Sequence, residues 1–258
     1  MVCNWKAYLS ISKSIKLAVA LSKWSKLNNL APDIIIAPSH ESLYPVSKIL
    51  DGTRISLCAQ NMNIDKQGAY TGAVSTEVLD EIDCKYVILG HSEIRSGISL
   101  GIAETDKIIA NKFGACMLGK LNPILCIGET LEERKKGKTY DVLKRQLLRD
   151  MGEMPNSLPK VKRIYVAYEP VWAISSNRPS AKPIPDEING TVVKLRILVE
   201  KEFGNKVSAQ TKFLYGGSVD STNIASYASQ SDIDGVLIGG MSTNFSKLTN
   251  MLKKLENK

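Results

Sequence analysis

The chain lacks the long apolar runs that membrane proteins need. A membrane-spanning helix requires about 20 consecutive apolar residues, whereas the apolar runs of this sequence are short and are separated by charged positions. The first residues also lack the apolar stretch of a secretory signal, because Trp5-Lys6 interrupts them. We therefore expect no membrane contact and a cytoplasmic location.

Cysteine and histidine are scarce and are poorly arranged for disulfides or metals. The five cysteines form no Cys-x-x-Cys pair, and three lie inside apolar runs, as reduced core thiols do. The two histidines, His40 and His91, are far apart, and no acidic pair has ligand spacing. The glycine fingerprint of dinucleotide sites is missing after the first apolar run, which continues as Asn4-Trp5-Lys6. We expect no metal and no cofactor.

Aromatic residues make up only 6% of the chain, so the 43% that is apolar predicts a largely aliphatic core. The net charge of +8 reflects lysines that are spread along the chain, the densest group being Lys135-Lys136-Gly137-Lys138. A nucleic-acid site favours a clustered basic face with interleaved aromatic residues. The pattern instead indicates a solvated surface that attracts small anionic substrates, and we expect no nucleic-acid partner.

The sequence does contain a repeated alternation of short apolar runs and amphipathic stretches. The runs lack polar alternation, which is typical of strands buried on both faces. They are Met1–Cys3, Ile34–Ala37, Ile55–Ala59, Tyr86–Leu89, Ile124–Ile127, Ile164–Ala167, Phe213–Tyr215 and Val236–Ile238. Four sets of apolar residues have the spacing of one helix face. They are Ile15, Ala18, Leu21 and Leu27; Val142, Leu143 and Leu147; Ile188, Val192, Leu195 and Val199; and Leu248, Leu252 and Leu255. Asp186 and Ser242 are the expected N-caps of the last two helices.

Eight strand–helix units predict an α/β fold in which parallel strands close into a (β/α)8 TIM barrel. The 258 residues allow about 32 per unit, near the length of one βαβ step. No linker divides the chain, so we expect a single domain over residues 1–258. An open doubly wound sheet is the structural alternative. In a barrel, the chemistry lies at the carboxyl ends of the strands.

Three titratable residues follow predicted strands. Glu169 comes directly after the sixth run, where a carboxylate is poorly solvated and suited to act as a general base. Lys6 follows the first run, and His91 follows the fourth. One base and two electrophiles at one end of a barrel suit proton abstraction beside a carbonyl group.

Glycine pairs follow the last two predicted strands. Gly216-Gly217-Ser218 and Gly239-Gly240 offer bare backbone N–H groups to an anion, which predicts that the substrate carries a phosphate. Two other polar residues receive structural interpretations. His40 is expected at the start of a helix, and Glu129 is expected only to lead into a helix that the Thr130-x-x-Glu133 box caps.

Eight motifs occur in an order and at spacings that are jointly specific. They are Asn4–Lys6, Ala59–Asn61, Gly68–Gly72, Val87–Glu93, Cys126–Thr130, Ala167–Ile174, Tyr215–Val219 and Gly235–Gly240. Through them the chain resembles the triosephosphate isomerase family over nearly its whole length. The resemblance implies a homodimeric barrel enzyme that interconverts D-glyceraldehyde 3-phosphate and dihydroxyacetone phosphate through an enediolate, without a cofactor.

The resemblance also implies a role for each candidate residue. Glu169 would be the general base, with His91 and Lys6 as the electrophiles. The implied substrate-binding residues are Asn4, Lys6, Ser175, Ser218, Gly239 and Gly240. The implied supporting residues are Glu93 beside Lys6, Cys126 in the interior, and Thr71 on a loop that reaches into the partner's site.

Two departures from the family pattern bear on the lid and the dimer. Residues 175–181 replace a glycine-rich closing loop and include Pro179, which limits the outgoing hinge, so we expect altered lid kinetics. Ala73 and Ile94 stand where the family commonly has a Glu and an Arg that meet across the dimer. Since both charges are missing, neither is left buried without its partner. We therefore expect a dimer with a more apolar contact.

Two other functions remain open from the sequence. One is a phosphate-binding barrel that acts on a related sugar phosphate, which requires Lys6, His91 and Glu169 to coincide by chance. The other is a catalytically weakened barrel kept as a phosphate-binding or interaction protein. The divergent residues 175–181 are the reason to consider it. The leading hypothesis is a working isomerase of a small phosphorylated triose.

Overall fold

The computed structural model describes residues 1–28, 33–99, 101–152, 154, 162–174 and 182–256. Its strands form a closed barrel in the order β1 to β8, which confirms the (β/α)8 fold and excludes the open sheet. The pairings β1–β2, β2–β3, β3–β4, β5–β6, β6–β7 and β1–β8 are parallel. The strands are β1 (Val2–Asn4), β2 (Ile34–Ala37), β3 (Ile55–Ala59), β4 (Tyr86–Leu89), β5 (Asn122–Ile127), β6 (Ile164–Tyr168), β7 (Thr211–Tyr215) and β8 (Gly235–Ile238).

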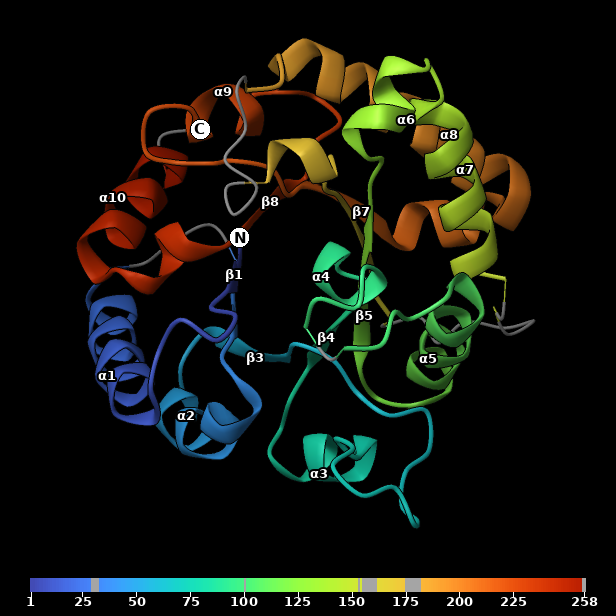
Figure 1. The fold of residues 1–258 in the computed structure, drawn as a ribbon. Coiled ribbons are helices and arrows are strands. Elements are labelled where there is room, and N and C mark those ends of the chain that lie inside the picture. The colour runs from blue at the N-terminus through green and yellow to red at the C-terminus, as the bar shows by residue number, and fades with distance from the viewer. Residues whose placement is uncertain (29–32, 100, 153, 155–161, 175–181, 257–258) are drawn as a thin grey trace. The chain divides into compact units, whose positions relative to one another are not determined.

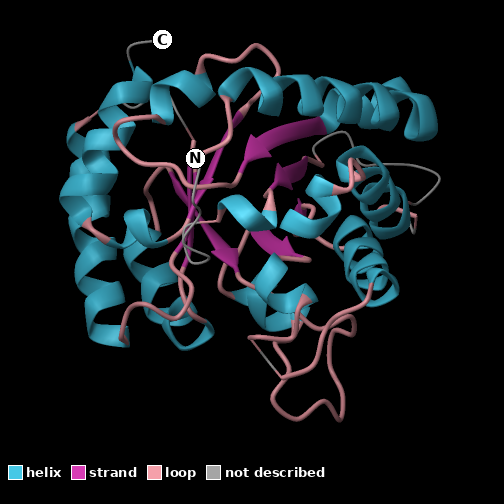
Figure 2. Cartoon of the chain, turned by 45° about the horizontal axis from the view of Figure 1, so that its top comes forward, coloured by secondary structure: helices cyan, strands magenta, loops and turns pink. Residues whose placement is uncertain are grey.

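All eight expected strands occur, and helices alternate with them along the chain. Figure 2 shows the strands in magenta and the helices in cyan. Every residue of β2, β4 and β6 is buried, which explains why these strands read as continuous apolar runs. β6 extends one residue beyond the expected end, to Tyr168. Glu169 therefore follows the strand without an intervening residue.

Contacts between residues divide the chain into two compact units. The first comprises Met1–Val87, Val219–Ser229 and Gly235–Lys258, and the second comprises Ile88–Ser218 and Gln230–Asp234. All five cysteines are buried thiols, as expected of core residues. Within the described ranges, none of the helices combines the length and apolarity that crossing a bilayer demands.

The first unit carries most of β1 to β4, β8 and five α-helices. The helices are α1 (Ile11–Leu27), α2 (Leu43–Leu50), α3 (Thr76–Glu81), α9 (Ile224–Ala228) and α10 (Phe245–Glu256), with short turns η1 (His40–Ser42) and η4 (Gly240–Thr243). Helix α1 packs against α2 and α10 (Figure 1). The expectation that His40 begins a helix is confirmed by η1.

Two expectations about helices of the first unit are wrong. Leu27 was expected on the buried face of α1 with Leu21, but 84% of it is exposed. Six residues turn a helix by about 240° beyond one full turn, so the two side chains lie on different faces. Ser242 was the expected cap of α10, but it lies in η4, and the Asn244 side chain accepts the Lys247 N–H at 3.0 Å instead.

The second unit carries the end of β4, β5 to β7 and five α-helices. They are α4 (Ser92–Arg95), α5 (Asp106–Leu118), α6 (Leu131–Lys135), α7 (Thr139–Asp150) and α8 (Pro185–Gln210), with the turn η2 (Val171–Ala173). Helix α7 packs against both α5 and α8. Asp186 was the expected cap of α8, but the helix begins at Pro185, so Asp186 lies in the first turn. A proline suits that first position because its missing N–H needs no partner there.

A buried ion pair lies between α4 and α7. Arg95 Nη2 is 2.5 Å from Asp150 Oδ2, and the Asp150 side chain is fully buried. Burial raises the pKa of Asp150 from 3.8 to about 6, in spite of the nearby Arg95 charge. Because the folded state favours the protonated acid, the stability from this group is complete below about pH 4 and is lost as the pH rises through about 6.

The substitution Asp150→Asn removes this titration. A rise in pKa from 3.8 to about 6 corresponds to about 3 kcal/mol. Between about pH 4 and pH 7.5, we expect the wild-type free energy of unfolding to fall by that amount relative to the variant. Urea unfolding at a series of pH values measures the difference between the two proteins. A difference that stays constant across the series would contradict the assignment.

Candidate active site

His91 is held at the end of β4 as the N-cap of α4. Its Nδ1 accepts the Glu93 backbone N–H at 3.2 Å, and the residue is 4% exposed. The Glu93 carboxylate lies 3.7 Å from the same nitrogen, beyond hydrogen-bond distance. Because Nδ1 acts as an acceptor, the ring proton is on Nε2. His91 therefore presents an N–H donor at Nε2.

Glu169 faces that donor from the end of β6. Its Oε2 lies 3.7 Å from His91 Nε2, and only 2% of the residue is exposed. Among the described residues, Oε2 has no hydrogen-bond partner. A carboxylate oxygen without a hydrogen-bond donor is open to accept a proton from a bound molecule. The two candidate acid–base residues of this unit are thus brought together as the sequence predicts.

Two glycines make room for Glu169. A Cβ atom on Gly216 would lie 2.4 Å from Glu169 Cγ, and one on Gly128 would lie 1.9 Å from the Glu169 carbonyl oxygen. The Glu169 backbone N–H is also bonded to the Ile127 carbonyl at 2.8 Å. The sequence indicated only an anion-binding role for Gly216, but in the structure its missing side chain also seats the candidate base.

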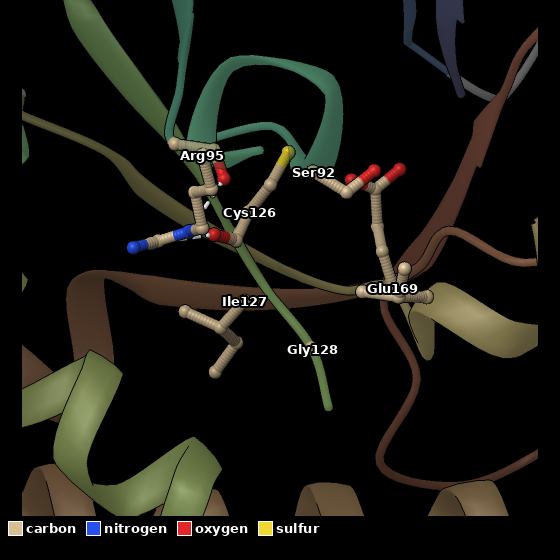
Figure 3. Close-up of a pocket in the computed structure, with 8 residues that line it drawn as sticks. Ser92, Arg95, Cys126, Ile127, Gly128 and Glu169 are labelled. Atoms are coloured by element: carbon tan, nitrogen blue, oxygen red, sulfur yellow. Dashed lines mark hydrogen bonds between the residues drawn. The ribbon is translucent and has the colours of Figure 1, made fainter. Parts of the chain in front are cut away.

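A small pocket opens beside Glu169 (Figure 3). It is lined by Gly90, Ser92, Arg95, Cys126, Ile127, Gly128, Glu169 and Val171. In Figure 3 the Ser92 and Glu169 side chains point toward one another. Cys126 is 1% exposed, which agrees with the interior supporting position that the sequence indicated.

Glu129 does more than lead into a helix. The expected capping box of Thr130 and Glu133 is present, yet Glu129 itself is fully buried. Trp172 Nε1 donates to Glu129 Oε1 at 2.8 Å, and the Tyr168 hydroxyl donates to Oε2 at 3.2 Å. Burial raises the pKa of Glu129, although both hydrogen bonds oppose the shift. The interpretation from sequence was therefore incomplete.

Arg134 also contacts Trp172. Its guanidinium lies 4.5 Å from the centre of the Trp172 ring and 3.1 Å from the Glu187 carboxylate. A cation over an indole face is attracted to the ring's electrons. Trp172 is thus held on its N–H edge by Glu129 and on its face by Arg134.

The first unit carries the remaining candidates near β1 and β8. Asn4 ends β1, is 4% exposed and accepts the Lys6 backbone N–H at 3.1 Å. Lys6 has a φ of +47°, a left-handed conformation that is rare outside glycine and that concentrates at functional sites. A Cβ atom on Gly239 would lie 3.6 Å from Lys6 Cε, so the lysine side chain runs beside the end of β8.

The candidates therefore fall into two sets, each described within its own unit. The first unit holds Asn4, Lys6, Thr71, Gly239 and Gly240, and the second holds His91, Glu93, Cys126, Glu169 and Ser218. Thr71 and Gly240 are exposed, and Ser218 is half-buried. Ser175 and the divergent segment 175–181 lie outside the described residues. In the part of the chain that the structure describes, no group of three His, Cys, Asp or Glu side chains is placed to hold a metal ion.

Comparison with known proteins agrees with this arrangement. A model of the triosephosphate isomerase family matches residues 1–255. The triosephosphate isomerase of Carboxydothermus hydrogenoformans is 39% identical over 250 residues, which cover 97% of this chain and 96% of the relative. The enzyme of Dictyoglomus thermophilum is 37% identical with 98% of both chains covered, and that of Clostridium perfringens is 35% identical with 96% of both covered. The chain belongs to the triosephosphate isomerase family.

Proposed function

We propose that this chain interconverts D-glyceraldehyde 3-phosphate and dihydroxyacetone phosphate, as its membership of the family indicates. The observation that carries the proposal is the buried pair of His91 and Glu169, with Oε2 of the acid 3.7 Å from Nε2 of the ring. Glu169 removes a proton from the carbon beside the carbonyl group and returns it to the neighbouring carbon. The His91 N–H stabilises the oxygen on which enediolate charge develops.

Lys6 supplies the positive charge for the same intermediate, and Asn4 fixes the lysine backbone through its 3.1 Å hydrogen bond. Parallel strands of a closed barrel carry these residues, and barrel chemistry is found at the carboxyl ends of such strands. The phosphate group is bound by backbone N–H groups that follow β7 and β8. The proposed phosphate ligands are Ser175, Ser218, Gly239 and Gly240.

Glu129 is a positioning residue in this proposal. It binds Tyr168 and Trp172, which stand one residue before and three residues after Glu169. Two hydrogen bonds to one buried carboxylate thereby fix the backbone on both sides of the base. Since proton transfer depends strictly on geometry, loosening this backbone slows the reaction.

We further infer that the chain works as a single domain over residues 1–258, as a homodimer and in the cytoplasm. Large apolar side chains exposed on an isolated chain mark interaction surfaces, and Tyr44, Ile98, Ile102 and Leu118 are each more than half exposed. Ala73 is exposed, whereas Ile94 is already buried within its own chain at 9% exposure. The apolar contact expected at Ile94 is therefore assigned to Ile98 and Ile102.

Shortening the base tests the function directly. Glu169→Asp withdraws the carboxylate by one methylene, and we expect kcat to fall on the order of 100-fold in a coupled assay with glyceraldehyde 3-phosphate. Glu77→Asp, on the exposed first turn of α3, is the matched control and should leave kcat unchanged. An unchanged rate in Glu169→Asp would refute the assignment of the base. A wild-type chain that binds inorganic phosphate but does not isomerise the triose would favour the weakened-barrel alternative.

Removing the charge of Glu129 tests its positioning role. Glu129→Gln weakens the acceptor of Trp172 and Tyr168, and we expect kcat to fall about tenfold with little change in KM, the cost of about one hydrogen bond. Glu132→Gln is the control, because the Glu132 side chain is 86% exposed. Steady-state kinetics measures both variants, and equal kcat values for the two would remove Glu129 from the proposal.

The dimer is tested by light scattering. At micromolar concentration we expect twice the mass of one chain, and we expect Ile98→Asp combined with Ile102→Asp to shift the mass toward the monomer, because a buried unpaired charge is costly. Leu27→Asp is the control, since this exposed residue belongs to α1 and has no part in the proposed contact. A stable wild-type monomer at this concentration would contradict the dimer proposal.

A further inference from the structure

Arg95 is a residue of the second unit for which the proposed reaction has no role. It ends α4, and its guanidinium turns back onto the backbone near the acid–base pair. Nε donates to the carbonyl of Gly90, the residue before His91, at 2.7 Å. Nη2 donates to the carbonyl of Cys126 in β5 at 3.0 Å. One planar side chain therefore joins the end of β4 to β5, as Figure 3 shows.

The contact with Gly90 is close. Gly90 has a φ of +64°, and a Cβ atom added to it would lie 2.6 Å from Arg95 Nη2. The guanidinium thus packs directly against the turn that aims the His91 ring. A planar group with several donors in fixed directions holds two carbonyl groups at a defined separation.

The strand β5, which Arg95 contacts through Cys126, also binds the backbone of Glu169. Ile127, the residue after Cys126, accepts the Glu169 backbone N–H at 2.8 Å. Gly128 then packs against the Glu169 carbonyl oxygen so closely that no Cβ atom fits there. A displacement of β5 therefore moves Glu169 with it, and Arg95 connects that strand to the turn that carries His91.

Two carboxylates fix the guanidinium itself. Arg95 Nη1 donates to Asp106 Oδ1 at 3.0 Å, and Nη2 lies 2.5 Å from Asp150 Oδ2. The side chain of Arg95 is 14% exposed and that of Asp150 is fully buried. Among the described residues, this guanidinium donates to two backbone carbonyls and two carboxylates, and a buried charge with such partners has one well-defined position.

We propose that Arg95 is a positioning residue of the isomerase reaction, which sets the separation of His91 and Glu169 by joining the backbone segments that carry them. The inference rests on the proposed function of that pair. Its prediction is specific, because an error of about 1 Å in the placement of reacting groups can cost 100-fold in rate. Arg95 contacts the backbone that carries the acid–base pair, so its effect falls on the chemical step.

The test is Arg95→Lys. Lysine keeps the charge near Asp150, but its single ammonium group does not reproduce the planar contact with both carbonyls. We expect kcat to fall about 10-fold to 100-fold and KM for glyceraldehyde 3-phosphate to change by less than about twofold. Arg149→Lys is the matched control, since Arg149 belongs to the same ion cluster, 3.8 Å from Asp106, but has a side chain that is 66% exposed. Its kcat should equal that of the wild type.

A second variant separates positioning from a merely structural role. Arg95→Ala leaves space for a free guanidinium ion, and we expect millimolar guanidinium chloride to restore kcat several-fold, while the same concentration of sodium chloride does not. Circular dichroism and thermal melting give the folded fraction by which each rate is divided. If Arg95→Ala does not fold, the Arg95→Lys kinetics decide alone.

The outcomes that overturn the inference are distinct from failure of the proposed function. A wild-type kcat per folded Arg95→Lys molecule, or a raised KM with unchanged kcat, overturns the positioning role while the isomerase stands. A wild-type chain without isomerase activity, or a Glu169→Asp variant of unchanged rate, overturns the proposed function itself. A lowered kcat with normal KM and rescue by guanidinium supports Arg95 as the residue that positions the pair.

Discussion

The burial of one carboxylate governs the arrangement of the second unit. Glu169 is 2% exposed, and its Oε2 has no hydrogen-bond donor among the described residues. Leaving a charged group in this state is costly, so the fold must hold it there by other contacts. Gly128 and Gly216 lack the side chains that would displace it, and the Ile127 carbonyl fixes its backbone.

Two charged residues near the pair of His91 and Glu169 keep that geometry in place. Glu129 binds the side chains on either side of the base, and Arg95 joins the turn before His91 to the strand beside Glu169. Both are charged groups removed from water, and each has several hydrogen-bond partners, as such groups require. The pocket beside Glu169 is shaped by backbone and small groups as much as by reactive side chains (Figure 3).

The barrel could be predicted from sequence because its strands are buried on both faces and therefore appear as uninterrupted apolar runs. The proximity of His91 and Glu169 could be predicted because both lie at the carboxyl ends of such runs, Glu169 directly and His91 after Gly90. Helix ends were predicted less well, as Leu27 and Asp186 show, since tertiary contacts and the first-turn proline decide where a helix begins and which face it buries. The roles of Glu129 and Arg95 were missed because their partners lie far along the chain, so local spacing gives no signal.

The central claim is that Glu169 moves a carbon-bound proton beside His91. Isomerisation in deuterium oxide, followed by nuclear magnetic resonance of the product, tests it most directly. A base that exchanges its proton with solvent leaves carbon-bound deuterium in the product, and Glu169→Gln should abolish both the turnover and the label. A Glu169→Gln variant that turns over at the wild-type rate, or that still places deuterium on carbon, would contradict the account.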